Sequence, residues 1–225
     1  MSKALFLIIL LFANFSYAYK GDFSTSFSVG SFFFPNTETG EFTSDSKFVK
    51  NGNFNLDFDN KFFALEGAAN YEITDIVAIA ANGIFVQNKV NTAFIPKVSD
   101  SSGTPFDHSS NVACGFINVT MKFDNKLDIA PFLGIGAGMS SVSFFIYNSI
   151  NLAYQGFAGM ELPLTSNVLL TSYIRYIQFN KVNFKVSSVS YIDSLKVKQT
   201  EAVDGRFEFD SIKAVFVNMG IKFVF

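Results

Sequence analysis

The last stretch of the chain, from Ala214 to Phe225, alternates between apolar residues and residues of mixed character. Its odd-numbered positions are all apolar, whereas its even-numbered positions include Asn218, Gly220 and Lys222. Successive side chains of a β-strand point to opposite faces of a sheet. This period of two therefore predicts a strand with one apolar face and one partly polar face.

Seven further strands are predicted earlier in the chain, six with similar alternation and one, 76–90, with two apolar faces. The predicted strands span residues 23–33, 62–73, 76–90, 112–123, 129–141, 152–164 and 168–179. Three tight turns, at 74–75, 124–126 and 165–167, alternate with four longer segments, among them 91–110 and 180–206. The mean hydropathy is +0.28, yet no helical span is visible after residue 18. Only helices and closed barrels satisfy their backbone groups in lipid, so the pattern predicts an all-β, eight-stranded antiparallel up-and-down transmembrane barrel.

One short segment does not fit this scheme directly. Phe54, Leu56 and Phe58 alternate in the opposite phase from the strand that follows them. Either a bulge near Asn60 resets the face, or the segment is a hairpin arm above the membrane. A ten-stranded barrel, with an extra turn at 59–61, is the alternative. The segment is shorter than the roughly 9–11 residues that a spanning strand needs, so we prefer eight strands.

The N-terminus has the pattern of an export signal. Lys3 supplies a positive charge, 4–12 is an uninterrupted apolar run, and Ser16 and Ala18 place small residues at the −3 and −1 positions of a cleavage site. The apolar run is shorter than the roughly 20 residues of a membrane-spanning helix. We expect residues 1–18 to be a signal peptide cleaved after Ala18, and 19–225 to be the barrel.

Ionisable residues on the polar faces define the inside of the predicted barrel. Glu66, Glu161 and Arg175 lie in phase with these faces, and exposing them to hydrocarbon would be costly. An eight-stranded barrel is just wide enough for side chains to fill, and charges buried there need partners. We therefore predict that Arg175 bonds Glu66, Glu161 or both, and that Lys122 or Lys222 takes part nearer the periplasm.

Three glycines of the segment 129–141 lie on one face. The face that carries Gly134, Gly136 and Gly138 leaves a gap in the predicted wall, which would admit bulky inward residues such as Phe132, Phe157 or Tyr173. The run superficially resembles a phosphate-binding loop, but it lacks the following helix and the Lys-Ser/Thr pair. Packing is the better explanation.

The composition excludes several function classes. A formal net charge of −2 and the absence of a basic run argue against nucleic-acid binding. One histidine and one cysteine cannot form a His/Cys metal cluster, and the aspartates match no calcium loop. Cys114 cannot form an intramolecular disulfide, and a small apolar strand residue explains it. We expect no cofactor and no metal.

The chain resembles the small OmpA-like and Omp25/31-type outer-membrane β-barrel family, and is most similar to surface antigens of rickettsia-like α-proteobacteria. The stretches that carry the resemblance are 130–138, 154–159, Arg175-Tyr176 and the terminal strand. The resemblance implies a Gram-negative outer-membrane location and contact with outer-membrane lipid. These motifs are specific to the fold rather than to a function.

The terminal strand also resembles the signal that closes bacterial outer-membrane barrels. That signal has a polar residue, a glycine two positions later, and two aromatics spaced by one at the end, matched here by Asn218, Gly220, Phe223 and Phe225. The resemblance implies recognition by the outer-membrane assembly machinery.

The function expected from these observations is that of a non-enzymatic structural or surface-exposed protein, similar to a surface antigen or adhesin. Contacts with a host or extracellular ligand would lie in the four long outer segments. The alternating piece 184–192 is either an ordinary strand extension or an edge that pairs with a partner strand. A narrow porin-type channel for small solutes is the alternative function.

A barrel hydrolase such as a lipid A deacylase is a weaker alternative. His108-Ser109-Ser110 has the His-x-Ser spacing of such enzymes. No acidic residue follows until Asp124, at the opposite end of the predicted strand, whereas a catalytic base needs an orienting group within hydrogen-bond reach.

Overall fold

The computed structural model describes residues 21–33, 38–45, 52–58, 62–92, 106–123, 129–144, 147–192 and 198–225. The export signal with Ala18 and the turn at 124–126 lie outside the described residues. The strands are β1 (Phe23–Phe33), β2 (Glu38–Ser44), β3 (Gly52–Phe58), β4 (Phe62–Glu72), β5 (Val77–Thr92), β6 (Phe106–Lys122), β7 (Ala130–Phe144), β8 (Tyr147–Pro163), β9 (Val168–Ile192) and β10 (Lys198–Val224). None of the described segments is a helix with the length and apolarity needed to cross a bilayer.

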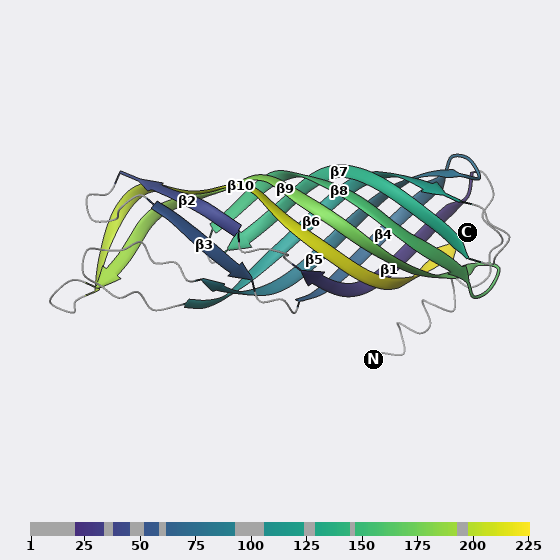
Figure 1. Cartoon of the computed structure of the whole chain (residues 1–225), viewed down its shortest axis with the longest axis horizontal. Coiled ribbons are helices and arrows are strands. Elements are labelled where there is room, and N and C mark those ends of the chain that lie inside the picture. The colour runs from purple at the N-terminus through teal and green to yellow at the C-terminus, as the bar shows by residue number, and fades with distance from the viewer. Residues whose placement is uncertain are drawn as a thin grey trace.

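Eight of these strands close into a barrel (Figure 1). β1 pairs with β4, β4 to β10 each pair with the next strand along the chain, and β10 pairs back with β1, all antiparallel. The short connections at 73–76 and 164–167 lie at the same end of the barrel as Phe225 (Figure 1). The predicted eight-stranded antiparallel barrel is confirmed.

The remaining two strands, β2 and β3, form a hairpin arm outside the membrane-spanning wall. This is one of the alternatives considered above for the segment that contains Phe54 and Phe58. β2 pairs with β3, and β2 also pairs with the outer part of β10, where Glu41–Ser44 lies beside Gly205–Glu208. β3 pairs with the outer end of β5. Over the described residues the sheet therefore contains ten strands, of which eight form the wall of the barrel. The alternative of a ten-stranded barrel is wrong.

Several strands continue beyond their predicted ends. β6 begins at Phe106 and β8 at Tyr147, while β9 runs to Ile192 and β10 starts at Lys198. The prediction of long polar segments at 91–110 and 180–206 is therefore partly wrong, because much of these segments is paired strand. Outside the lipid both faces of a strand can contact water, so polarity stops marking the strand although its hydrogen-bonded ladder continues.

A kink changes which face of the β9–β10 extension is buried. Lys181 has a positive φ of 43°, in the left-handed region that side chains other than glycine rarely adopt. Before it, Ile177 and Phe179 are buried, and after it Val182 and Phe184 are buried. The kink therefore turns the β9 extension so that its even-numbered residues point inward. There Val182 and Phe184 belong to the apolar cluster that also contains Phe42 and Phe209, which we call the outer core.

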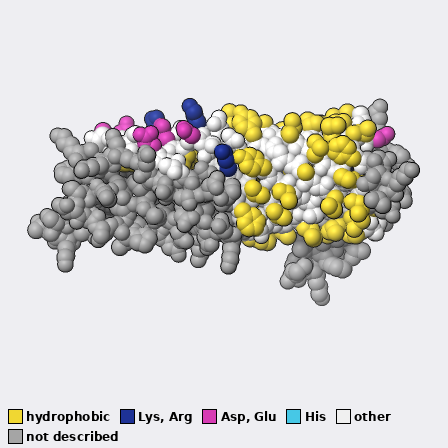
Figure 2. All heavy atoms as spheres, viewed as in Figure 1, with side chains coloured by type: hydrophobic (Ala, Val, Ile, Leu, Met, Phe, Trp, Pro, Cys, Tyr) yellow, Lys and Arg dark blue, Asp and Glu magenta, His cyan; other side chains and the backbone are white. Residues whose placement is uncertain are grey.

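The outside of the barrel is apolar. Exposed large hydrophobic side chains occur on all eight strands of the barrel and so form a belt. On the face shown in Figure 2 they cover the barrel, and the charged side chains visible there lie mainly beyond them on the outer extension. Phe27, Ile117 and Ile135 are 68%, 66% and 69% exposed, which in water would be unfavourable for residues of this size. The belt is the surface expected of a barrel immersed in lipid.

The lumen has two parts with different chemistry. The part toward the outer extension is filled by apolar side chains, among them Phe32, Phe116, Ile177, Phe179 and Phe216, each no more than 2% exposed. The part toward the short turns carries the buried ionisable and amide side chains.

Candidate functional site: the charged lumen

The first charge cluster joins strands on opposite sides of the barrel. Arg175 on β9 and Glu66 on β4 are both nearly fully buried, and Nη2 of Arg175 donates to Oε1 of Glu66 at 2.7 Å. Asn82 donates to the same oxygen at 2.8 Å, and Asn218 donates to Oε2 at 3.0 Å. The Tyr173 hydroxyl also donates to Oε2. The Glu66 carboxylate thus has several donors in place of water, as a buried charge requires.

Aromatic rings surround the Arg175 guanidinium. Its Cζ lies 5.1 Å from the ring centroid of Tyr173, 5.3 Å from that of Phe157 and 5.9 Å from that of Phe216. Nε and Nη1 have no hydrogen-bond partner, and the ring faces offer these buried donors a cation–π environment. Arg175 therefore marks the boundary between the apolar part of the lumen and the polar part.

A second cluster lies nearer the short turns. Lys222 Nζ donates to Glu161 at 3.0 Å and to Glu72 at 3.5 Å. Lys122 donates to Glu72 and lies 3.8 Å from Glu161. Two lysines and two glutamates thus surround one another, with Lys222 more deeply buried than Lys122.

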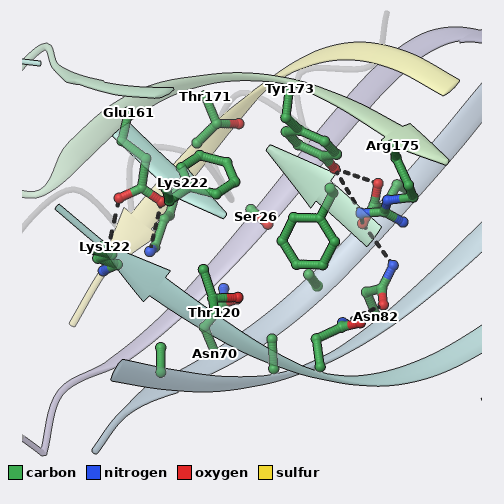
Figure 3. Close-up of a pocket in the computed structure, with 17 residues that line it drawn as sticks. Ser26, Asn70, Asn82, Thr120, Lys122, Glu161, Thr171, Tyr173, Arg175 and Lys222 are labelled. Carbon is green, nitrogen blue, oxygen red and sulfur yellow. Dashed lines mark hydrogen bonds and ion pairs between the residues drawn. The ribbon is translucent and has the colours of Figure 1, made fainter. Parts of the chain in front are cut away.

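A small cavity of about 60 Å³ separates the two clusters (Figure 3). Polar side chains of modest size line it, including Ser26, Asn70, Thr120 and Thr171. A cavity of this size admits water-sized molecules, and its polar lining suits them.

The buried charges of the two clusters balance. Glu66, Glu72 and Glu161 oppose Arg175, Lys122 and Lys222. Each acidic group therefore has a basic partner within the low-dielectric lumen, which reduces the large cost of burying an isolated charge. Within the described residues the lumen is a packed interior rather than an open bore, as expected for eight strands.

The structure places the predicted lumen residues inside the barrel but divides them between the clusters. Arg175 contacts Glu66 and not Glu161, which instead contacts the two lysines. Sequence reasoning did not assign Glu72 to the network, although it shares the polar face with Glu66 and could have been found from that phase. Asn82 had only a weak signal, because both faces of 76–90 are apolar. Asn118, which donates to Oδ1 of Asn82 at 2.7 Å, lies on the polar face of 112–123 with Thr120 and Lys122.

Phe157, one of the three rings predicted to fill the glycine gap on β7, lies at Gly134. A Cβ placed on Gly134 would lie 2.3 Å from Cζ of Phe157, and one on Gly136 would lie 2.0 Å from Oδ1 of Asn118. The ring of Phe157 packs against Phe132 and Tyr173, with centroids 6.2 and 6.3 Å apart. The missing side chains therefore make room for lumen residues from the neighbouring strands.

The residues of the terminal-strand motif have packing roles. Asn218 donates to Ser28 Oγ at 2.8 Å in addition to Glu66, and a Cβ on Gly220 would lie 2.4 Å from the Phe27 carbonyl oxygen. The Phe225 ring stacks on Phe23, with centroids 6.3 Å apart, and Phe223 pairs with Thr25 in the ladder. These contacts close the barrel between its first and last strands.

Other candidate chemistry finds little support among the described residues. The backbone of His108 lies in β6 opposite Val90, and its side chain lies outside the described part. No group of three or more His, Cys, Asp or Glu residues in the described segments is placed to hold a metal. Cys114 is buried in the apolar part of the lumen, among the residues of the outer core.

The geometry defines a small outer-membrane β-barrel, and comparison with known proteins agrees. A family described as surface antigen matches residues 114–225, which include all the stretches that carry the resemblance noted above. No curated protein matches the sequence.

Solved structures share the fold at low sequence identity. The outer-membrane protein OprG from Pseudomonas aeruginosa has a TM-score of 0.60 at 12% identity, covering 93% of this chain and 99% of that one. The outer-membrane protein AlkL, solved in lipid bilayers, has a TM-score of 0.52 at 14% identity, covering 95% and 94%. The protein is a β-barrel of the Gram-negative outer membrane, and its apolar belt faces membrane lipid.

Proposed function

We propose that this protein is a non-enzymatic, surface-exposed structural barrel, similar to a surface antigen or adhesin, whose ligand contacts lie on the outer strand extensions. The observation that carries the proposal is the filled lumen. Apolar side chains occupy the part toward the extension, and two charge-balanced clusters occupy the rest. A barrel packed in this way favours a scaffold role, with recognition on the parts that project from the membrane.

A narrow channel for small solutes is the competing function, and conductance separates the two. We expect the full chain, inserted into planar bilayers, to give no reproducible open level. Truncating Phe179 and Phe216 together to alanine, both in the apolar part of the lumen, should raise the frequency of conducting events. A stable open level in the unmodified protein would refute the scaffold role.

Surface recognition requires its own test. Cells that display the full chain should bind host cells or extracellular proteins more strongly than cells that display a variant in which a short turn replaces residues 186–202. Heat-modifiable gel migration would verify that both barrels fold. Equal binding by the two would remove the adhesin-like role and leave a purely structural one.

Two further assignments belong to this proposal. Residues 1–18 act as a signal peptide, leaving a mature barrel of 19–225, which the mass of the protein extracted from outer membranes would test. Asn218, Gly220, Phe223 and Phe225 act as the signal read by the assembly machinery. Phe225→Ala should slow assembly in cells while refolding into detergent in vitro changes little. The surface-antigen match supports kinship with the rickettsia-like antigens, which the sequences of further relatives would test.

A further inference from the structure

The extended half of β9 forms the edge of the outer sheet. β8 pairs with β9 only as far as Ala153 and Phe179, whereas β10 pairs with β9 as far as Ile192. On the other side of β10 the sheet continues through β2 and β3 to β5. Over the described parts of the chain, no strand pairs with β9 on its second side beyond Phe179.

The backbone of this edge is oriented for pairing. The Asn183 N–H points away from β10, because it donates to the Ser149 hydroxyl on β8 at 3.2 Å. Backbone groups alternate sides along a strand, so Lys185 and Ser187 direct their N–H and C=O groups toward the same edge. Ser149 therefore covers only the first part of the edge, and the part from Lys185 outward presents a row of donors and acceptors.

The same hairpin already accepts an added strand on its other side. β2 lies along β10 from Gly205 to Glu208, and its Phe42 is fully buried with its ring centroid 4.7 Å from that of Phe207. The neighbouring residues of β2, Glu41 and Thr43, are exposed. On this added strand Gly40 and Phe42 are therefore buried, whereas Thr39, Glu41 and Thr43 face solvent.

The charges on β9 indicate the chemistry of a partner. Lys181 and Lys185 lie on its exposed face, while Val182 and Phe184 lie on its buried face. If two copies of β9 paired antiparallel about Asn183, Lys181 would face Lys185, and like charges directly opposite one another are destabilising. An acidic strand would instead face complementary charges.

We propose that the β9 edge from Lys185 outward is a docking site for an extended segment of another protein, in which acidic residues alternate with apolar ones. The segment adds as a further strand, with main-chain hydrogen bonds supplying affinity, while Lys185 on the open edge and Lys181 next to its covered inner end supply selectivity. This inference rests on the proposed surface function and names the partner class for it.

Synthetic peptides on the full chain in detergent micelles test the site. One probe alternates Val with Glu, and a second has Lys in place of Glu. Fluorescence anisotropy should show the acidic peptide binding about tenfold more tightly, because the two lysines attract Glu and repel Lys. The double variant Lys181→Glu/Lys185→Glu should reverse the preference. Lys213→Glu, an exposed lysine on β10, is the matched control and should leave the preference unchanged.

A second pair of variants isolates the backbone. Lys185→Gln removes only the charge, whereas Lys185→Pro also removes an N–H that points to the free edge and not to β10. The proline variant should bind the acidic peptide several-fold more weakly than the glutamine variant. Equal binding by the two, or no binding of either peptide to the unmodified protein, would overturn the proposal. If the unmodified protein dimerises and the Lys185→Pro variant does not, the occupant of the edge is a second copy of this chain and the proposal is overturned.

The cell-binding assay distinguishes this inference from the function on which it rests. If cells displaying the Lys185→Pro variant bind host material as well as the unmodified protein does, the edge is not the docking site although the surface function holds. If the unmodified protein binds no host material, the surface function itself fails.

Discussion

Arg175 and Glu66 meet across the barrel although β10 and β1 separate their strands in the wall. Their contact links β9 to β4 through the lumen, and Tyr173 and Asn218 join it from the polar faces of β9 and β10. The wall is held by its backbone ladder, so this buried pair provides a connection that the ladder does not. Removing the pair should therefore lower the free energy of unfolding even though the backbone ladder remains.

Arg175→Ala should lower the stability of the barrel strongly. The change leaves the Glu66 carboxylate buried without its cationic partner, and breaking a buried pair in this way typically costs about 3–5 kcal/mol. The urea midpoint of unfolding in detergent micelles, followed by heat-modifiable migration, would measure the loss.

A double variant separates this charge effect from lost packing. Arg175→Met with Glu66→Gln removes both charges while keeping similar volume, and such replacements are often close to neutral. We expect the double variant to recover much of the midpoint lost in Arg175→Ala. An unchanged midpoint in Arg175→Ala would contradict the role of the pair.

The two lysines of the second cluster should differ in importance. Lys222 is 5% exposed in its side chain and contacts both glutamates, whereas the Lys122 side chain is 16% exposed. Water can replace part of the hydrogen bonding and charge that Lys122 supplies to the glutamates. Lys222→Gln should therefore lower the urea midpoint more than Lys122→Gln. Refolding in vitro is the suitable assay, because Lys222 lies in the terminal strand, which carries the proposed assembly signal. An assay in cells would combine assembly with stability. Equal shifts would mean that burial does not rank these contacts.

Gly134→Ala should destabilise the barrel, because the new Cβ would overlap the Phe157 ring and approach the Val119 carbonyl oxygen at 2.9 Å. Overpacking of this kind typically costs about 1–3 kcal/mol. Gly115→Ala is the matched control, since nothing lies within 4 Å of a Cβ at that position. Adding Phe157→Leu should restore part of the midpoint in the Gly134→Ala variant. If the two alanine variants unfold at the same midpoint, the glycine gap has no packing role.

The barrel was predictable because lipid on one side and a packed lumen on the other force each spanning strand to alternate. The glycine face of β7 and the inward placement of Glu66, Glu161 and Arg175 followed from the same phase. The phase could not decide whether Glu66 or Glu161 is the partner of Arg175. That choice depends on the stagger of the strands around the barrel, which phase alone does not specify.

The outer extension was less predictable for a physical reason. Beyond the membrane, β9 and β10 are held by pairing with each other and with β2, and such pairing leaves no strict polarity pattern. The kink at Lys181 also reverses which residues are buried, so extending the phase of 168–179 outward assigns the wrong face. A lysine gives no local signal for a left-handed backbone, in contrast to glycine or asparagine.

A charge on the lipid face should destabilise the protein according to its depth. Ile135 lies near the middle of β7 and is 69% exposed, so Ile135→Arg should cost about 2–4 kcal/mol in a bilayer. Ile73 lies at the short-turn end, where the same change should cost about 0–1 kcal/mol. Unfolding midpoints in liposomes measure both. Equal costs at the two positions would mean that the apolar belt does not mark the depth of the membrane.

Lys181→Gly should stabilise the outer extension or leave it unchanged. A side chain at φ 43° costs roughly 1–2 kcal/mol relative to a relaxed backbone, and glycine avoids this cost while losing some entropy on folding. Lys181→Val should be destabilising, since a β-branched residue tolerates this backbone least. Lys185→Gly, at a position without positive φ, is the control and should weaken the strand. Hydrogen exchange of the β9–β10 extension reports these local effects, because they need not change global unfolding. Faster exchange in Lys181→Gly than in Lys185→Gly would show that the kink does not depend on the left-handed residue.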